Sequence, residues 1–361
     1  MPHDLHLLEN SFCRRLGIQW PLIQAPMGGG PSTPQLVAAV SNAGALGSLA
    51  AAYWAAPVIE HAIQETRKLS LCPFAVNLFA PTKTPLIDMQ LVAEALKVTQ
   101  GYRQELTLPE PLVQPPFSED FEKQFAVVLH YKPAVFSFTF GLIPEELIKE
   151  CAQQKIMTIG TATTLEEGLA LQESGVDAVV AQGMEAGGHR GTFTANQQDT
   201  LIGTFVLTKI LTQALSIPVI ASGGIMNGTG IAAALNLGAQ VVQLGTAFLL
   251  CQEAGTAPTY REALQHAQGH DTQLTRAFSG RWARGIKNRF MLEMEQHDYS
   301  ILPFPIQNAF TRDIRNKANE LGRAEFLSLW AGQGIGLIRQ MRAKKLLHTL
   351  YEETIVALEK E

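Results

Sequence analysis

Short apolar runs alternate with segments of helical periodicity through roughly the first 250 residues of the chain. The runs are apolar at consecutive positions and are bounded by turn residues, which is typical of strands buried on both faces of a parallel sheet. The predicted strands are eight in number and lie at residues 21–25, 46–50, 73–78, 134–138, 156–159, 177–180, 218–221 and 240–244.

Between these strands the apolar positions recur at helical spacing. Helices are predicted at residues 35–42, 57–69, 118–130, 144–153, 165–174, 200–215 and 230–237, and Ser32 or Thr33 caps the first of them. A strand followed by a helix implies parallel strands joined by right-handed crossovers. Eight such units over about 250 residues match a (β/α)8 TIM barrel. An open doubly wound sheet is the alternative, but no G-x-G-x-x-G follows the first strand.

Two parts of the chain do not follow this alternation of strands and helices. Residues 80–117 are rich in proline around a helical piece near 89–101, and we interpret them as an insertion after the third strand, either a lid or an idle excursion. Beyond Gln252 the pattern is only helical, with helices at 259–268, 309–321, 324–329 and within 338–358. We therefore expect a barrel over residues 1–252 and a helical accessory domain over 253–361 that covers the substrate.

Composition narrows the class of protein. Of the 361 residues 46% are apolar and 17% are charged, and the net charge of −5 gives no reason to expect nucleic acid or an anionic membrane as partner. No window approaches the roughly 20 apolar residues of a membrane helix, and the first ten residues lack a signal pattern. The four cysteines lie far apart without metal-ligand spacing, and no clustered Asp, Glu or His supports a metal. We expect a metal-free cytoplasmic protein.

The stretch from Ala181 to Gly191 follows the sixth predicted strand and places four glycines around His189. Glycine lets the backbone approach a flat ligand closely, and histidine has the side-chain pKa nearest neutrality. The alternative is a tight turn with an incidental histidine. At the carboxyl end of a barrel strand, however, this loop is expected to border an active site.

The next two strand ends also carry small residues. Gly223 and Gly224 follow the seventh strand, while Gly245 and Thr246 follow the eighth. Barrels frequently bind a phosphate at this place, where exposed backbone N–H groups and a helix N-terminus face the anion. Gln24, Asn77 and Gln182 end other strands, and their carboxamides suit the mixed edge of a heteroaromatic ring. Alternatively, these carboxamides cap strand ends.

Several motifs together resemble the nitronate monooxygenases, formerly called 2-nitropropane dioxygenases. The resemblance lies in residues 24–29, 77–79, 182–189, 221–225 and 244–248, and residues 278–285 and 330–334 are similar to the class I branch. It implies a barrel that binds FMN without a covalent bond, with the tail partly covering the flavin. It also implies oxidation of a small nitronate or nitroalkane with O2 to a carbonyl compound and nitrite.

The resemblance assigns roles to individual positions. Residues along the flavin ring would be Ala25, Pro26 and Met27. Residues that flank or bond the isoalloxazine and ribityl would be Asn77, Gln182, Gly187 and Gly188. Residues at the phosphate would be Gly223, Gly224, Gly245 and Thr246, with Gln243 nearby. His189 would face the substrate as a base or as the partner of the anionic nitronate, and the roles of Tyr260, Phe304 and Arg312 stay open.

Other functions fit the same residues. A flavin-dependent NAD(P)H reductase, acting on an enoyl-acyl-carrier protein or a quinone, shares much of the glycine and histidine pattern. A flavin-binding sensor without turnover and a metal-free phosphosugar isomerase are further alternatives. A homodimer is compatible with the sequence.

Overall fold

The structure is a computed structural model that describes residues 8, 10–83, 85–194 and 201–359. Its centre is an eight-stranded parallel sheet in the order β1-β9-β8-β6-β5-β4-β3-β2. The sheet closes on itself, because Ile23 of β1 bridges Leu46 just before β2, and the Gln24 N–H donates to the Leu46 carbonyl at 2.9 Å. Closure confirms the predicted (β/α)8 barrel and excludes the open doubly wound sheet.

Each predicted barrel strand is present. The bounds are β1 Leu22–Gln24, β2 Gly47–Ala50, β3 Phe74–Phe79, β4 Val135–Thr139, β5 Met157–Ala162, β6 Ala178–Gln182, β8 Val219–Ser222 and β9 Val241–Leu244. All eight carboxyl ends meet at one mouth, where barrel enzymes place their active sites.

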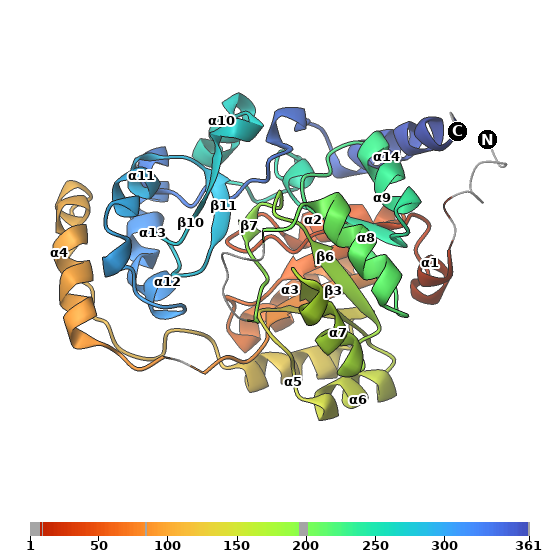
Figure 1. Ribbon diagram of the computed structural model, residues 1–361, viewed down its shortest axis with the longest axis horizontal. Coiled ribbons are helices and arrows are strands. Elements are labelled where there is room, and N and C mark those ends of the chain that lie inside the picture. The colour runs from red at the N-terminus through yellow and green to blue at the C-terminus, as the bar shows by residue number, and fades with distance from the viewer. Residues whose placement is uncertain (1–7, 9, 84, 195–200, 360–361) are drawn as a thin grey trace.

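Helices surround the barrel (Figure 1). They are α1 Ser11–Leu16, α2 Pro34–Asn42, α3 Ala56–Leu69, α5 Phe121–Tyr131, α6 Glu145–Gln153, α7 Leu165–Glu173, α8 Thr204–Ala214, α9 Gly228–Asn236 and α14 Ala343–Leu358. Thr33, not Ser32, caps α2 by accepting the Leu36 N–H at 3.0 Å. The predicted helix 200–215 begins at Thr204, and Thr200 lies outside the described residues. The last helix, α14, packs on α2 and α9.

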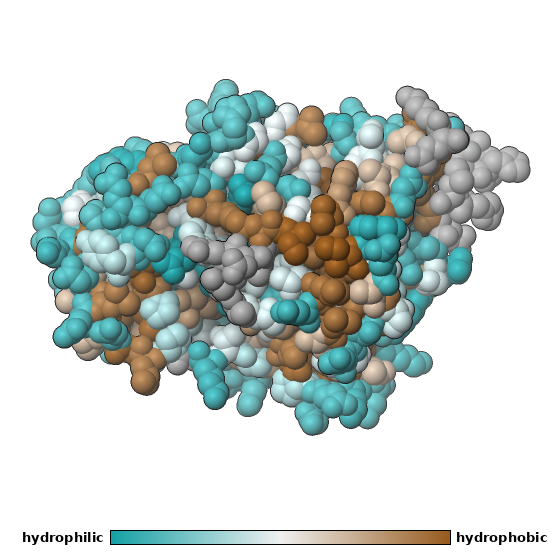
Figure 2. Space-filling model, viewed as in Figure 1, coloured by the Kyte–Doolittle hydropathy of each residue, from teal (hydrophilic) through white to brown (hydrophobic). Residues whose placement is uncertain are grey.

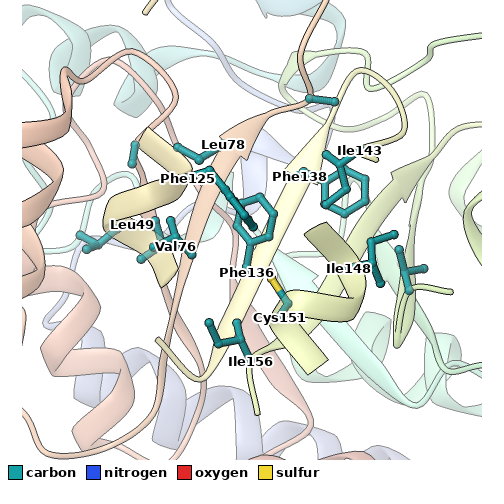
Figure 3. Packing of buried hydrophobic residues seen from close by; sticks show 14 of the residues in the cluster. Leu49, Val76, Leu78, Phe125, Phe136, Phe138, Ile143, Ile148, Cys151 and Ile156 are labelled. Carbon is teal, nitrogen blue, oxygen red and sulfur yellow. The ribbon is translucent and has the colours of Figure 1, made fainter. Parts of the chain in front are cut away.

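The core lies between the sheet and these helices. Figure 3 shows Phe136 of β4 facing Phe125 of α5, with Cys151 of α6 nearby; the three side chains are at most 4% exposed. On the outer surface, apolar side chains gather over α7 and α8 (Figure 2), where Phe205 and Val206 are 50% and 59% exposed.

The insertion after β3 reaches the tail. Its helix α4 Met89–Glu105 lies beside α12 Ile306–Phe310 and α13 Arg312–Leu321 (Figure 1). Arg103 is 3% exposed and donates to the Asp313 carboxylate at 2.5 Å and to the Phe310 carbonyl at 2.8 Å. Insertion and tail therefore pack together, away from the barrel helices.

The prediction of a purely helical pattern beyond Gln252 is wrong. Besides α10 Pro258–His266 and α11 Arg289–Glu295, the tail contributes β10 Thr272–Thr275 and β11 Ala283–Ile286, which form an antiparallel sheet with β7 Gly188–His189. These strands span at most four residues and β11 pairs with a segment far away in sequence, so no local periodicity reveals them. The helix predicted at 324–329 is only a 3-10 turn, Ala324–Phe326, and the one at 309–321 is split into α12 and α13.

Across the described ranges, we find no helix with the length and apolar character needed to span a membrane.

Candidate active site

The loop after β6 is held by the tail. Its strand β7 pairs with β11, so that His189 lies opposite Ala283 and Gly188 opposite Arg284. The Arg190 N–H donates to the Trp282 carbonyl at 2.8 Å. The segment with the candidate histidine is therefore not a free loop but the edge of a small sheet, and its position depends on the tail.

The Gln182 side chain holds this loop in place through hydrogen bonds to its backbone. Its Nε2 donates to the His189 carbonyl at 3.0 Å, and its Oε1 accepts the Gly191 N–H at 2.7 Å. Arg190 is 1% exposed and donates to the Gly183 carbonyl at 2.7 Å. Gln182 thus fixes the path of the loop, whatever it also contributes to a ligand.

A buried carboxylate fixes the far end of the loop. Glu167 is fully buried and accepts hydrogen bonds from the Thr192 hydroxyl at 2.6 Å and from the Phe193 N–H at 2.6 Å. Burial alone would raise the pKa of Glu167, but its hydrogen bonds to Thr192, Thr194, Phe193 and Thr163 bring the pKa below the ordinary value. The carboxylate is therefore ionised and fully engaged as a structural anchor.

His189 lies among aromatic rings at the mouth. Its ring centre is 5.4 Å from that of Trp330, 5.8 Å from that of Phe140 and 6.5 Å from that of Phe304. Nε2 lies 2.8 Å from the Ser279 hydroxyl, which itself donates to the Arg281 carbonyl at 3.2 Å. A neutral imidazole donates from one ring nitrogen and accepts at the other, so His189 can hydrogen-bond Ser279 and also take up a proton.

The charge state of His189 follows from its surroundings. Burial lowers the pKa of His189 to about 3, and repulsion from Arg281 and Arg315 adds to the effect. The imidazole is therefore neutral at neutral pH. A neutral ring beside two guanidinium groups suits an anionic ligand.

The positive charges come from the tail. The Arg281 guanidinium stacks 4.1 Å from the centre of the Phe140 ring and donates to the Thr192 carbonyl at 2.6 Å. Arg315 of α13 donates to the Asn308 carbonyl at 2.7 Å. Among the residues that the structure describes, neither arginine forms an ion pair with a carboxylate. Arg281 and Arg315 are half-buried, and cations of this kind without a carboxylate partner favour an anion.

The opposite side of the mouth is made of glycines. Gly223 and Gly224 adopt φ of 129° and 68°, and a Cβ on Gly223 would lie 2.5 Å from the Thr204 hydroxyl. In the described part of the chain, the backbone N–H groups of Gly223, Gly224, Gly245 and Thr246 donate to no protein acceptor. Free amides at two neighbouring strand ends form a cradle of the kind that holds a phosphate.

A second loop of the tail covers this cradle. A Cβ on Gly187 would lie 2.5 Å from the Gly332 nitrogen, and one on Gly334 would lie 2.4 Å from the Gly224 carbonyl oxygen. The Gly332 N–H donates to the Thr246 hydroxyl at 2.9 Å. The glycines of the barrel and of the tail therefore allow two backbones to touch where side chains would separate them.

The remaining predicted residues occupy the same rim. Gln24 is fully buried, accepts the Ser48 N–H at 2.9 Å and donates to the Ser32 hydroxyl at 3.1 Å. These bonds match the alternative prediction, in which the Gln24 carboxamide caps a strand end. Asn77 donates to the Ser137 hydroxyl at 3.0 Å, and Gln243 to the Ser222 hydroxyl at 3.4 Å.

The loop after β1 joins this rim. The Ala25 N–H donates to the Leu244 carbonyl at 2.8 Å, and Pro26 and Met27 follow directly. A Cβ on Gly245 would lie 3.5 Å from that of Ala25, so the two strand ends are in contact. The ends of β1, β3, β6, β8 and β9 thus meet at one mouth.

The three tail residues to which the sequence assigned no definite role also lie near the mouth. Phe304 lies 5.5 Å from Phe140, ring centre to ring centre, and its neighbours include Arg281. Tyr260 donates its hydroxyl to the Trp330 carbonyl, so it supports the ring that faces His189. Arg312 begins α13 and is exposed. No group of three or more His, Cys, Asp or Glu side chains able to hold a metal occurs in the described ranges.

Sequence reasoning assigned no role to Tyr53, Phe140, Ser279, Arg281 or Arg315. Arg281 and Ser279 stand in the segment 278–285 that carries the class I resemblance, which was the available signal. Tyr53 and Arg315 belong to no motif, so only the fold brings them to the mouth.

A closed barrel with a neutral histidine, free backbone amides and unpaired arginines at its mouth defines a barrel enzyme. A family model described as nitronate monooxygenase matches residues 10–353. The probable nitronate monooxygenase of Bacillus subtilis is 41% identical over 350 residues, covering 96% of this chain and 99% of the relative. That of Staphylococcus haemolyticus is 42% identical over 347 residues, covering 96% and 97%. The chain belongs to the nitronate monooxygenase family and is an oxidoreductase.

Solved structures agree with this placement. Nitroalkane oxidase from Streptomyces ansochromogenes has a TM-score of 0.91 and 37% identity, covering 97% of this chain and 99% of that one. FabK from Thermotoga maritima is more distant, with a TM-score of 0.77 and 28% identity over 98% of both chains. The barrel and its covering tail are therefore an arrangement shared with these structures.

Proposed function

We propose that the protein is an FMN-dependent nitronate monooxygenase that oxidises alkyl nitronates with O2 to carbonyl compounds and nitrite. The observation that carries the proposal is the pairing, at one barrel mouth, of a backbone amide cradle with a neutral His189 flanked by Arg281 and Arg315. Family membership supports the reaction class.

The residues at the cradle fit the phosphate of FMN. Gly223, Gly224, Gly245 and Thr246 offer free N–H donors, and no carboxylate of the described chain is bonded to them. Residues that would border the ring are Ala25, Pro26, Met27, Asn77, Gln182, Gly187 and Gly188. When bound, FMN supplies the electron acceptor for the nitronate and the reaction with O2.

The side of the mouth that carries Arg281 and Arg315 favours an anionic nitronate over a neutral nitroalkane. A nitronate has already lost its α proton, so it needs charge complementarity, which Arg281 and Arg315 supply. A neutral nitroalkane needs a base, and His189 with a pKa of about 3 is a weak one in the absence of ligand. We therefore propose nitronates as the main substrates, and nitroalkanes as slower ones that depend on His189 as the base.

Anaerobic mixing of the FMN-loaded protein distinguishes this function from a flavin-dependent NAD(P)H reductase. We expect propyl-1-nitronate to bleach the flavin within the turnover time and NAD(P)H to bleach it far more slowly. In air, nitronate should drive O2 uptake and nitrite release. Rapid bleaching by NAD(P)H without nitronate oxidation would replace our proposal with the reductase.

Two further expectations are independent of this chemistry. A cytoplasmic location and a homodimer both stay predictions from the sequence. Sedimentation of the purified protein would test the second.

A further inference from the structure

The insertion helix α4 carries a charged side chain that is buried against the tail. Arg103 is 3% exposed, and its guanidinium lies 5.0 Å from the centre of the Phe310 ring. It donates to the Phe310 carbonyl at 2.8 Å and to the Asp313 carboxylate at 2.5 Å. Phe310 ends α12 and Asp313 lies in the first turn of α13. Arg103 therefore holds the junction of these two helices from the side on which α4 lies (Figure 1).

Stability alone does not explain a guanidinium at this place. A buried ion pair is often no more stabilising than apolar side chains of similar volume, because both charges lose their water. Here the Asp313 side chain is 37% exposed, and Nε of Arg103 has no hydrogen-bond partner among the described residues. A guanidinium adds direction, which an apolar side chain cannot supply, since its donors fix the Phe310 carbonyl relative to α4.

The same junction also bonds a second segment of the tail. Thr311, which directly follows Phe310, donates its hydroxyl to the Phe278 carbonyl at 2.6 Å. Gln307 of α12 donates to the Ala277 carbonyl at 2.6 Å. The Thr311 and Gln307 side chains are at most 1% exposed, so water does not replace these bonds without a rearrangement. The position of this segment therefore follows the position of the junction.

The segment leads directly to the candidate base. Ser279 follows Phe278, is 1% exposed, and its hydroxyl lies 2.8 Å from Nε2 of His189. The next residue, Gly280, has a φ of 84°, and a Cβ there would lie 2.4 Å from the Leu302 carbonyl oxygen. The turn after Ser279 is thus in close contact with the chain that leads into α12. A continuous series of contacts runs from α4 to the imidazole.

We propose that Arg103 is a positioning residue for His189. It acts by fixing the junction of α12 and α13 and, through the Thr311 hydroxyl, the place of the Ser279 hydroxyl. The inference rests on the proposed function for the role of His189 as a base, but not for the position of its ring. A displacement of about 1 Å caused by a remote mutation can lower a rate about 100-fold, so a support of this kind affects proton transfer.

Neutral nitroalkanes and preformed nitronates separate positioning from a general loss of structure, since only nitroalkanes need a base. We expect Arg103→Met to lower kcat on 1-nitropropane about tenfold or more, with KM changed less than about threefold. Its kcat on propyl-1-nitronate should change less than about threefold. Equal losses on both substrates, or no loss on either, would overturn the proposal.

Thr311→Val carries the same test if loss of Arg103 disturbs the fold. It keeps the shape of the side chain and removes only the hydroxyl that bonds the Phe278 carbonyl. We expect the substrate selectivity of Arg103→Met from Thr311→Val, and constants close to those of the wild type from Thr311→Ser, which keeps the hydroxyl. Equal constants for the Val and Ser variants would contradict the role of this bond.

Glu105→Gln is the matched control on the same helix. Glu105 also joins α4 to the tail, through ion pairs with Arg289 at 2.8 Å and Arg323 at 2.6 Å, but neither arginine lies at the junction. All three side chains are partly exposed, and such pairs contribute little. We expect wild-type constants on both substrates. A selective loss on 1-nitropropane here would mean that any weakening of the contact between insertion and tail has this effect.

A double-mutant cycle tests whether Arg103 acts through Ser279. If both substitutions release the same ring, Arg103→Met should lower kcat on 1-nitropropane much less in a Ser279→Ala background than in the wild type. A double variant whose loss equals the product of the two single losses would show independent effects and overturn the proposed route.

A spectroscopic readout separates this inference from the proposed function. In protein with isotope-labelled histidine, the ring nitrogen resonances of His189 are those missing from His189→Asn. We expect Arg103→Met and Thr311→Val to shift them, through the altered bond to Ser279, and Glu105→Gln to leave them in place. If no nitronate is oxidised but the resonances shift, the function fails and the positioning stands. If nitronates are oxidised and neither variant shifts the resonances, the positioning fails and the function stands.

Discussion

The two sides of the mouth present different kinds of hydrogen-bond donor. The glycine side uses backbone N–H groups of Gly223, Gly224, Gly245 and Thr246, which the barrel fixes in place. The arginine side presents the side chains of Arg281 and Arg315, which the tail supplies. A mutation cannot remove a backbone N–H donor of these glycines, but it can add a side chain that blocks the donor. Side-chain donors, in contrast, can be removed one at a time. We therefore expect single substitutions to change substrate binding more readily than they change FMN binding.

Among the variants that we consider, replacement of His189 should have the largest effect on activity. We expect His189→Asn to retain FMN, because the backbone pairing of β7 with β11 does not depend on the imidazole, yet to lose about 10²- to 10⁴-fold in kcat/KM on neutral nitroalkanes, which need a base. The same variant assayed with the preformed nitronate is the internal control, and there the loss should be about tenfold or less. Unchanged turnover of nitroalkanes would remove His189 from the chemistry.

Gly187 tests the contact between barrel and tail. A Cβ there would lie 2.5 Å from the Gly332 nitrogen, which is backbone and cannot rotate away. We expect Gly187→Ala to lower the free energy of unfolding by about 3 kcal/mol, at the upper end of the cost of overpacking, and to speed FMN loss. Urea unfolding measures the first effect. Gly101→Ala, where a Cβ meets nothing within 4 Å, is the control. Equal stability of the two variants would contradict the close approach.

Gly245 tests the cradle itself. Its φ of −107° suits any residue, and a Cβ there meets only the Ala25 side chain at 3.5 Å, so substitution need not disturb the fold. We expect Gly245→Asp to weaken FMN binding about 10- to 100-fold through repulsion of the phosphate, and Gly245→Asn, of equal size, to weaken it much less. Fluorescence titration of the apoprotein gives both constants. Equal weakening by Asp and Asn would indicate a steric cause.

The smallest predicted effect concerns acid stability. The folded pKa of His189 is about 3 and the unfolded value about 6.5. Between these values the unfolded chain binds more protons, so this residue costs stability as the pH falls below 6.5. Relative to His189→Asn, the wild type should melt at a progressively lower temperature from pH 7.5 to pH 5. A constant difference between their melting temperatures would mean that the ring is not held neutral.

Much of the fold could be predicted because its signals are local. Each barrel strand is a short apolar run ended by a turn, and the glycines of the cradle directly follow two of them. The small sheet of β7, β10 and β11 could not be predicted, since Ala283 pairs with His189 across the chain and neither segment is long enough to show a period. Gln24 shows a different limit: its residue type suited a ligand, but burial and bonds to Ser48 and Ser32 make it structural.

We propose that the free amides at the ends of β8 and β9 hold the phosphate of FMN and so orient the flavin toward His189. Titration of the apoprotein with FMN and with riboflavin, which lacks only the phosphate, tests this most directly. We predict that FMN binds at least about 100-fold more tightly, as expected for a dianion held by several charge-assisted hydrogen bonds. Equal affinity for the two flavins would contradict the claim.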